Sequence, residues 1–245
     1  MSSMLRLLFT ILFAICSYYL YAFTEKGIIQ VIFKALPLWI LTGLVTVYYS
    51  LLYSSRNYKR YNSSYRYNIS IGLLLSSLGD IFLEINDNQV FDFGYDVGYF
   101  IFGLLSFLVA HIFYILAYRV VIQAGNKILK ISKPEFRIVC LIYFGVMMRV
   151  LLPNVETALL APIFIYGAVL SYVAYLSIML YFINNSIGRY AMYGTLSFVL
   201  SDSILAIDKF HVSISNAKHL VMITYYLGQS FIAMSTFCTE VEHNK

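Results

Sequence analysis

The sequence predicts an all-α integral membrane protein, a bundle of about eight transmembrane helices, and two observations carry this prediction. Hydrophobic residues fill 60% of the 245 positions, charged residues fill only 12%, and the mean hydropathy is +0.76. A soluble domain needs more charge to cover its surface. The apolar residues also occur in blocks of about 20, the length that a helix needs to cross a bilayer. Backbone amides find no water in lipid, so such blocks must be helical.

Each block can be justified in chain order. The first could be mistaken for a signal peptide, but its flank Tyr18–Tyr21 lacks the small residues of a cleavage site, so we expect a retained helix. The connections are too short for a soluble core, so residues 1–245 should form a single transmembrane domain. The expected spans are Leu5–Phe23, Ile28–Leu52, Asn68–Ile85, Gly98–Val121, Phe136–Leu152, Leu159–Phe182, Tyr190–Ile207 and Lys218–Thr239.

The distribution of Lys and Arg predicts the orientation. One side receives 12 of the 17 basic residues, in the two termini and in the second, fourth and sixth connections. By the positive-inside rule both termini therefore face the cytoplasm. The third connection, with Asp87, Asp92 and Asp96, would face the lumen or exterior. The net charge of +5 then reflects topology, and we expect no nucleic-acid partner. The acceptor motifs at Asn62 and Asn184 would be cytoplasmic and carry no glycan.

The third and seventh blocks show a weak sequence similarity that suggests an internal repeat. The third ends in Leu78–Ile85 and the seventh in Leu200–Ile207, and both read Leu, a small residue, Asp, two variable positions, Leu, one more, Ile. The two helices are four apart and run in the same direction, as two parallel four-helix halves would require. Leu and Ile match by chance in membrane helices, so the aspartates carry this signal.

Asp80 and Asp202 are the most informative residues. Each lies well inside an apolar span with no basic residue one helical turn away. An intramembrane carboxylate costs at least ~2.5–3.5 kcal/mol at a helix centre. Both lie roughly 18–20 Å along their helices from the cytoplasmic end, at 1.5 Å per residue, so they could share one cavity. The alternative is that each merely hydrogen-bonds a neighbouring helix.

Other polar side chains in the spans have two interpretations each. His111, Tyr225, Tyr226 and Gln229 could line a site, or could join helices by hydrogen bonds. Lys34 could bind an anionic head group, or extend its ammonium to the interface. Glu84 lies one turn beyond Asp80 and near the predicted helix exit, so we expect it to be solvated. Asp208 and Lys209 are expected to be ordinary flanking charges.

Several kinds of catalytic site are not indicated. The sequence has no Gly-x-Ser-x-Gly elbow, no His-Glu-x-x-His and no Gly-rich phosphate loop. Only His111 of the four histidines lies deep in a span, and the three cysteines show no metal or redox spacing, so we predict no metal and no cofactor. A pair of intramembrane carboxylates without a metal site is consistent with two functions, acid–base catalysis and proton-coupled transport.

Four short motifs occur in order along the chain: Gly79-Asp80-x-x-Leu83, Gly103-x-x-x-Phe107-x-x-x-His111-x-x-Tyr114, Ser201-Asp202-x-x-Leu205-Ala206-x-x-x-Phe210 and Tyr225-Tyr226-x-x-Gln229. Together they resemble the YhhN-type lysoplasmalogenase family of eight-helix membrane proteins. A further Lys34-x-x-Pro37 is similar to the Lys and Pro that begin the family's second helix, although many members have them closer together. The resemblance covers nearly the whole chain.

The resemblance implies hydrolysis of the vinyl-ether bond of a lysoplasmalogen, a lysophospholipid, within the lipid bilayer. It implies that Asp80 and Asp202 are catalytic, and a lipid substrate with a retained first helix favours the endoplasmic reticulum. The chemistry agrees, because a vinyl ether needs a protonated acid and a carboxylate, and burial of two neighbouring carboxyls favours protonation of one. Substrate or water would be bound by Lys34, which meets the phosphate, and by His111, Tyr114, Tyr225, Tyr226 and Gln229.

Two other classes of function remain open from the sequence. Two parallel halves with one carboxylate each would also suit a proton-coupled carrier. A structural or receptor-like protein would use the aspartates for stability alone. No oligomeric state is predicted.

Overall fold

The chain folds into a bundle of α-helices, as predicted. The computed structural model describes residues 3–24, 26–53, 60–88, 96–124 and 134–238. Within these ranges there are eight α-helices, two short 3-10 turns and no strand, and all eight helices are long and apolar enough to cross a membrane. The helices are α1 (Ser3–Ala22), α2 (Ile28–Tyr53), α3 (Arg60–Asn88), α4 (Asp96–Ala124), α5 (Pro134–Leu151), α6 (Thr157–Ile183), α7 (Asn185–Phe210) and α8 (Ala217–Ser235), with 3-10 turns at Leu152–Asn154 and Thr236–Cys238.

Several helices extend beyond the predicted apolar spans. Helix α3 begins at Arg60 instead of Asn68, and α7 begins at Asn185 instead of Tyr190. Hydropathy detects only the part in hydrocarbon, whereas a helix can continue through polar residues because its backbone bonds are internal. At the start of α7 the side chain of Asn184 accepts a hydrogen bond from the Ile187 amide at 3.1 Å, which caps the helix. Much of the expected second, third and fourth connections, including Asp92, lies outside the described residues, as do residues 239–245.

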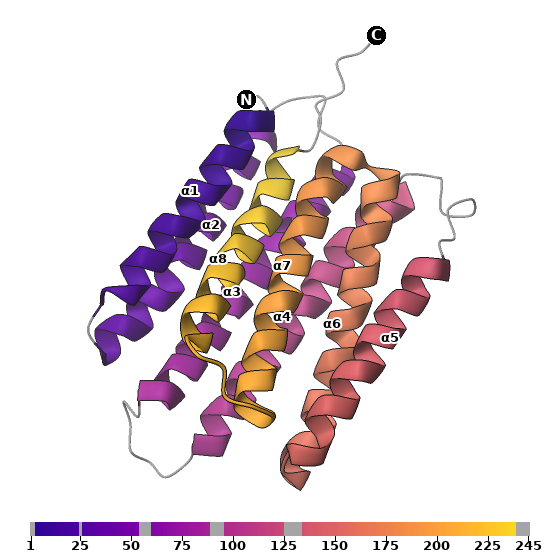
Figure 1. The fold of residues 1–245 in the computed structure, drawn as a ribbon. Coiled ribbons are helices and arrows are strands. Elements are labelled where there is room, and N and C mark those ends of the chain that lie inside the picture. Colours follow the sequence, from indigo (N-terminus) through magenta and orange to yellow (C-terminus); the bar gives the residue numbers. More distant parts are fainter. Residues whose placement is uncertain (1–2, 25, 54–59, 89–95, 125–133, 239–245) are drawn as a thin grey trace.

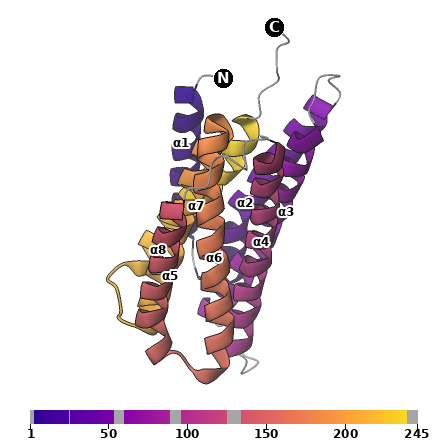
Figure 2. The same ribbon diagram turned by 90° about the vertical axis from the view of Figure 1, so that its right-hand side faces the viewer.

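The packing order places α8 near the middle of the bundle. It contacts α7 extensively and also α1, α2 and α3. Helix α3 packs along α4 and α2, while α6 packs along α7 and α4. Helix α5 lies at the edge against α6, which both views of the ribbon show (Figures 1 and 2). The start of α1 and the end of α8 lie at the same end of the bundle (Figure 1). The outer face of α5 exposes large apolar side chains such as Ile142, as expected of a surface in contact with lipid.

The contacts between helices are only partly the same in the two four-helix halves. Helix α3 pairs with α4 and with α2, and in the other half α7 pairs with α8 and with α6. The first helices of the halves differ, because α1 packs mainly on α8 whereas α5 packs mainly on α6. The internal repeat therefore stays a hypothesis.

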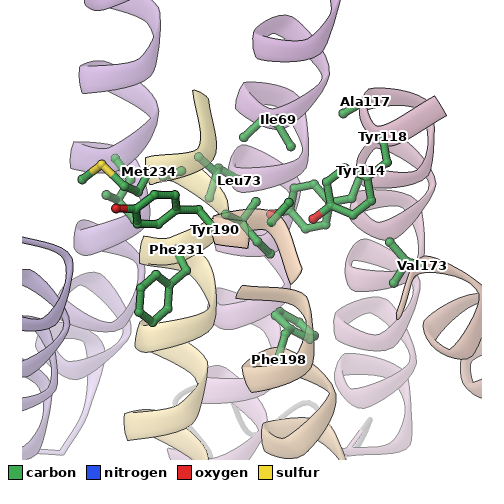
Figure 3. Packing of buried hydrophobic residues seen from close by; sticks show 14 of the residues in the cluster. Ile69, Leu73, Tyr114, Ala117, Tyr118, Val173, Tyr190, Phe198, Phe231 and Met234 are labelled. Carbon is green, nitrogen blue, oxygen red and sulfur yellow. The ribbon is translucent and has the colours of Figure 1, made fainter. Parts of the chain in front are cut away.

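Buried side chains hold the bundle together at two levels. The larger cluster joins α1, α2, α3, α4, α6, α7 and α8, and Figure 3 shows part of it, including Tyr190 and Phe231, whose ring centroids are 6.2 Å apart. Buried hydroxyls add links between helices. Tyr118 on α4 bonds Thr195 on α7 at 2.8 Å, and Tyr65 on α3 bonds Ser235 on α8 at 2.6 Å. A smaller cluster joins α4, α5 and α6 at the other end.

Candidate active site

A cavity of about 370 Å³ lies inside the bundle, and every one of the eight described helices contributes to its wall. Exposed side chains at the joined ends of α7 and α8 also line it, so it opens at that end of the bundle. By the predicted orientation this is the luminal or exterior end. One lining residue from each helix, in order, is Tyr21, Lys34, Asp80, Phe100, Tyr143, Tyr166, Asp202 and Tyr225.

Asp80 and Asp202 both line this cavity and lie at matching depth. Asp80 comes eight residues before Asn88, the last residue of α3, and Asp202 comes eight residues before Phe210, the last residue of α7. Eight residues of helix span roughly 12 Å. Because α3 and α7 begin earlier than we expected, the aspartates lie farther from the helix starts than the 18–20 Å of our sequence estimate, at about 30 Å for Asp80 and about 26 Å for Asp202. Asp80 is buried and Asp202 is partly buried.

Each aspartate is held by one tyrosine from another helix. The Tyr225 hydroxyl on α8 donates to Oδ2 of Asp80 at 2.6 Å. The Tyr166 hydroxyl on α6 donates to Oδ2 of Asp202 in a short hydrogen bond. In the described part of the chain, neither Oδ1 atom receives a protein hydrogen bond. Each carboxyl is thus oriented through one oxygen while the other can meet a molecule in the cavity.

Glu84 corrects one sequence expectation, because it is fully buried instead of solvated. The Lys34 ammonium lies 2.9 Å from its Oε2, and the Lys218 ammonium lies 3.0 Å from its Oε1. The Tyr21 hydroxyl also donates to the carboxylate, at 3.1 Å to Oε2. Helix α3 continues past the predicted end at Ile85, so Glu84 lies inside the bundle. The cluster ties α1, α2, α3 and α8 together.

Lys34 lines the cavity, but its ammonium does not extend to the interface. The side chain is 7% exposed and is paired with Glu84. Its backbone carbonyl accepts a hydrogen bond from the Tyr226 hydroxyl at 3.1 Å. Lys34 is therefore part of the buried frame around the cavity.

Four of the predicted binding residues lie in the bundle around the cavity and are not among the residues that line it: His111, Tyr114, Tyr226 and Gln229. The Tyr114 hydroxyl donates to Oε1 of Gln229 at 2.9 Å. His111 Nδ1 lies 2.7 Å from the Phe107 carbonyl oxygen, and its ring packs on Phe198. These contacts match the alternative interpretation as links between helices. Of the predicted binding residues, Lys34 and Tyr225 line the cavity.

The structure adds cavity residues that sequence reasoning missed. Tyr166 holds Asp202, and Tyr143 on α5 bonds Ser203 at 2.8 Å beside it. A tyrosine inside an apolar span resembles ordinary packing, so no sequence signal separates these from the other tyrosines. Lys209 and Lys218 line the open end, although we expected Lys209 to be an ordinary flanking charge. The sequence shows that both lysines lie close to the ends of helices, but it does not show the cavity between them.

The wall away from the charged residues is apolar. Helix α5 supplies Phe144, Met147 and Leu151, and α6 supplies Ile163 and Leu170. Phe100, Leu104 and Phe107 on α4 continue the same surface. The cavity thus joins a polar part, with two carboxyls, to an apolar part that can hold a hydrocarbon chain.

Together these features define a class: a polytopic helical membrane protein with two cavity-facing carboxyls among its helices. Comparison with known families identifies the class more closely. The model of the YhhN family matches residues 29–236, and the chain belongs to that family.

Curated relatives carry the name lysoplasmalogenase. Lysoplasmalogenase TMEM86A of Bos taurus is 29% identical over 171 residues, which cover 68% of this chain and 64% of the relative. The Homo sapiens TMEM86A protein is 28% identical over 174 residues, with the same shares covered. Lysoplasmalogenase TMEM86B of Homo sapiens is 28% identical over 143 residues, which cover 58% and 56% of the two chains. The match thus spans less than two thirds of these relatives. No solved structure matches the chain.

Proposed function

We propose that the protein hydrolyses the vinyl-ether bond of lysoplasmalogens to a fatty aldehyde and glycerophospho-ethanolamine or -choline. One observation carries the proposal: Asp80 and Asp202 line a single cavity at equal distance from the ends of their helices, each held through one oxygen by a tyrosine. The names of the curated relatives support the substrate class. The apolar wall beside the carboxyls supports an amphiphilic substrate.

The reaction needs two carboxyl groups in different protonation states. The carboxylic acid of the pair gives its proton to the vinyl carbon remote from the oxygen, which leaves an oxocarbenium ion. The carboxylate of the pair stabilises this positive charge and takes a proton from water as the water attacks. The resulting hemiacetal breaks its C–O bond, which releases the aldehyde and returns a hydroxyl to the glycerol. Glycosidases divide labour between two carboxyls in the same way.

The remaining residues have supporting roles in this proposal. Tyr225 and Tyr166 orient the two carboxyls and leave Oδ1 of each toward the substrate. The alkenyl chain lies along Phe144 and Met147 of α5, the helix at the edge of the bundle, so a lipid can approach sideways from the bilayer. Tyr114, Tyr226 and Gln229 act by fixing α2, α4 and α8 around the cavity. His111 packs α4 against Phe198 on α7.

We also propose that the protein lies in the endoplasmic reticulum membrane with both termini in the cytoplasm. The bias of Lys and Arg toward one side supports the orientation. A glycan on Asn62 or Asn184 of the expressed protein would contradict it, because glycans are added on the luminal side.

Aldehyde release tests the activity. The purified protein in detergent, without any gradient, is given a lysoplasmalogen and, separately, the saturated alkyl analogue of the same chain length. The proposal expects aldehyde from the vinyl ether alone, because the saturated ether has no double bond to protonate. The competing carrier would instead move substrate across a vesicle membrane in response to a proton gradient and release no aldehyde. Such a result would overturn the hydrolase.

A further inference from the structure

Two lysines flank the open end of the cavity where α7 and α8 are joined. Lys209 lies in the last turn of α7, and Lys218 is the second residue of α8. Both side chains are exposed and both line the cavity. Their ammonium groups are therefore accessible to a ligand that enters the cavity from this end.

The Lys218 ammonium is held by Glu84 and is still accessible to a ligand. Its Nζ lies 3.0 Å from Glu84 Oε1, and its side chain is 45% exposed. An ammonium has three N–H donors. The bond to Glu84 therefore fixes the position of the charge and uses one donor, and the exposed side chain leaves the ammonium accessible to a ligand. Lys34 lacks this freedom, because its side chain is 7% exposed and is paired with the same carboxylate.

An aromatic ring, and not a carboxylate, holds the Lys209 side chain in place. Its Nζ lies 4.3 Å from the centroid of the Phe100 ring, a cation–π contact that holds the ammonium against the cavity wall. Such a contact uses the charge and leaves the N–H groups for an oxyanion. Lys209 also follows Asp202 by seven residues, so the two share one face of α7 roughly 10 Å apart along the axis.

The open end also carries two acidic residues. Asp87 and Asp208 line it, and Asp208 accepts a hydrogen bond from the Ile214 amide at 2.7 Å, which shapes the connection between α7 and α8. The opening thus presents both signs of charge. A head group with an anionic phosphate and a cationic amine matches such an opening, whereas a purely anionic ligand would meet repulsion.

We propose that Lys218 and Lys209 bind the phosphate of the lysophospholipid, and that Lys34 serves to hold Glu84 and through it Lys218. The inference rests on the proposed function for its lipid substrate. The phosphate then fixes the glycerol so that the vinyl ether lies at the carboxyls.

Binding of two saturated probes tests the phosphate site apart from hydrolysis. One probe is a radiolabelled 1-O-alkyl-glycerophosphoethanolamine, and the other is the 1-O-alkylglycerol with the same chain and no phosphate. The full-length protein in nanodiscs should bind the first more tightly. Lys209→Gln and Lys218→Gln should each weaken its binding about fivefold, the factor expected for one exposed ion pair, and leave alkylglycerol binding unchanged.

Matched variants separate recognition from damage to the fold. Lys26→Gln removes an exposed charge from the α1–α2 connection at the same end, away from the cavity lining, and should have no effect. Lys218→Arg should retain the affinity, and Lys209→Gln leaves the Glu84 cluster intact. The proposal is overturned if the parent binds both probes equally or neither, or if the two Gln variants behave like Lys26→Gln. Selective binding by a parent that releases no aldehyde would keep the phosphate site and refute the hydrolase.

Discussion

The Tyr225 hydroxyl on α8 lies 2.6 Å from Oδ2 of Asp80 on α3, so a residue of the last helix orients the carboxyl of the third. Tyr225→Phe should lower kcat for aldehyde release by about tenfold, the factor for loss of a hydrogen bond worth about 1.4 kcal/mol, and leave KM within about twofold. Steady-state kinetics on protein of equal melting temperature measures both constants. Tyr172→Phe, on the exposed face of α6, is the control. A rise in KM at constant kcat would instead make Tyr225 a binding residue.

Tyr166→Phe should have the same effect on Asp202. The two tyrosines come from different helices and hold different carboxyls, so their effects should multiply in the double variant. The kcat of the Tyr166→Phe, Tyr225→Phe enzyme measures this. A double variant no slower than either single one would show that the two carboxyls do not act in the same rate-determining step.

We expect the main role of Glu84 to be in the stability of the fold. Glu84→Gln leaves the buried Lys34 without its carboxylate and should lower the free energy of unfolding by about 3 kcal/mol, since breaking a buried pair leaves an uncompensated charge. Thermal unfolding in detergent reports the loss. Adding Lys34→Met to Glu84→Gln should recover part of it, while Glu156→Gln, an exposed carboxylate at the same end, should change nothing. An unchanged melting temperature for Glu84→Gln would contradict the structural role of the cluster.

The crossing of α7 and α8 depends on two glycines. A Cβ added to Gly194 would lie 2.7 Å from the carbonyl oxygen of Gly228 and from the amide nitrogen of Ile232, so backbone atoms would have to move. Small residues let membrane helices approach in this way. Gly194→Ala should destabilise the protein by about 2 kcal/mol, comparable to overpacking a core. Gly43→Ala on α2, where nothing lies within 4 Å of the added Cβ, is the matched control for thermal unfolding.

The prediction from sequence succeeded where a residue's own neighbours carry the signal. The eight spans follow from apolar runs, and Asp80 and Asp202 stand out because each interrupts such a run. The partners of these residues could not be predicted, because Tyr166 in an apolar span resembles any packed aromatic residue. Glu84 was misjudged for a similar reason. Its nearness to the end of the apolar run suggested solvent, whereas Lys34 and Lys218, which bury it, come from distant parts of the chain.

The central claim is that two carboxyls perform the reaction together, and one measurement tests it most directly. Aldehyde release is measured for Asp80→Asn, Asp202→Asn and the control Glu156→Gln, each folded to the parent's melting temperature. Each Asp→Asn change should lower kcat at least about a hundredfold, the lower end of what a general acid or base contributes, because an amide can neither give the proton nor activate water. Glu156→Gln should match the parent. If either Asn variant kept the parent's kcat, the two-carboxyl mechanism would be wrong.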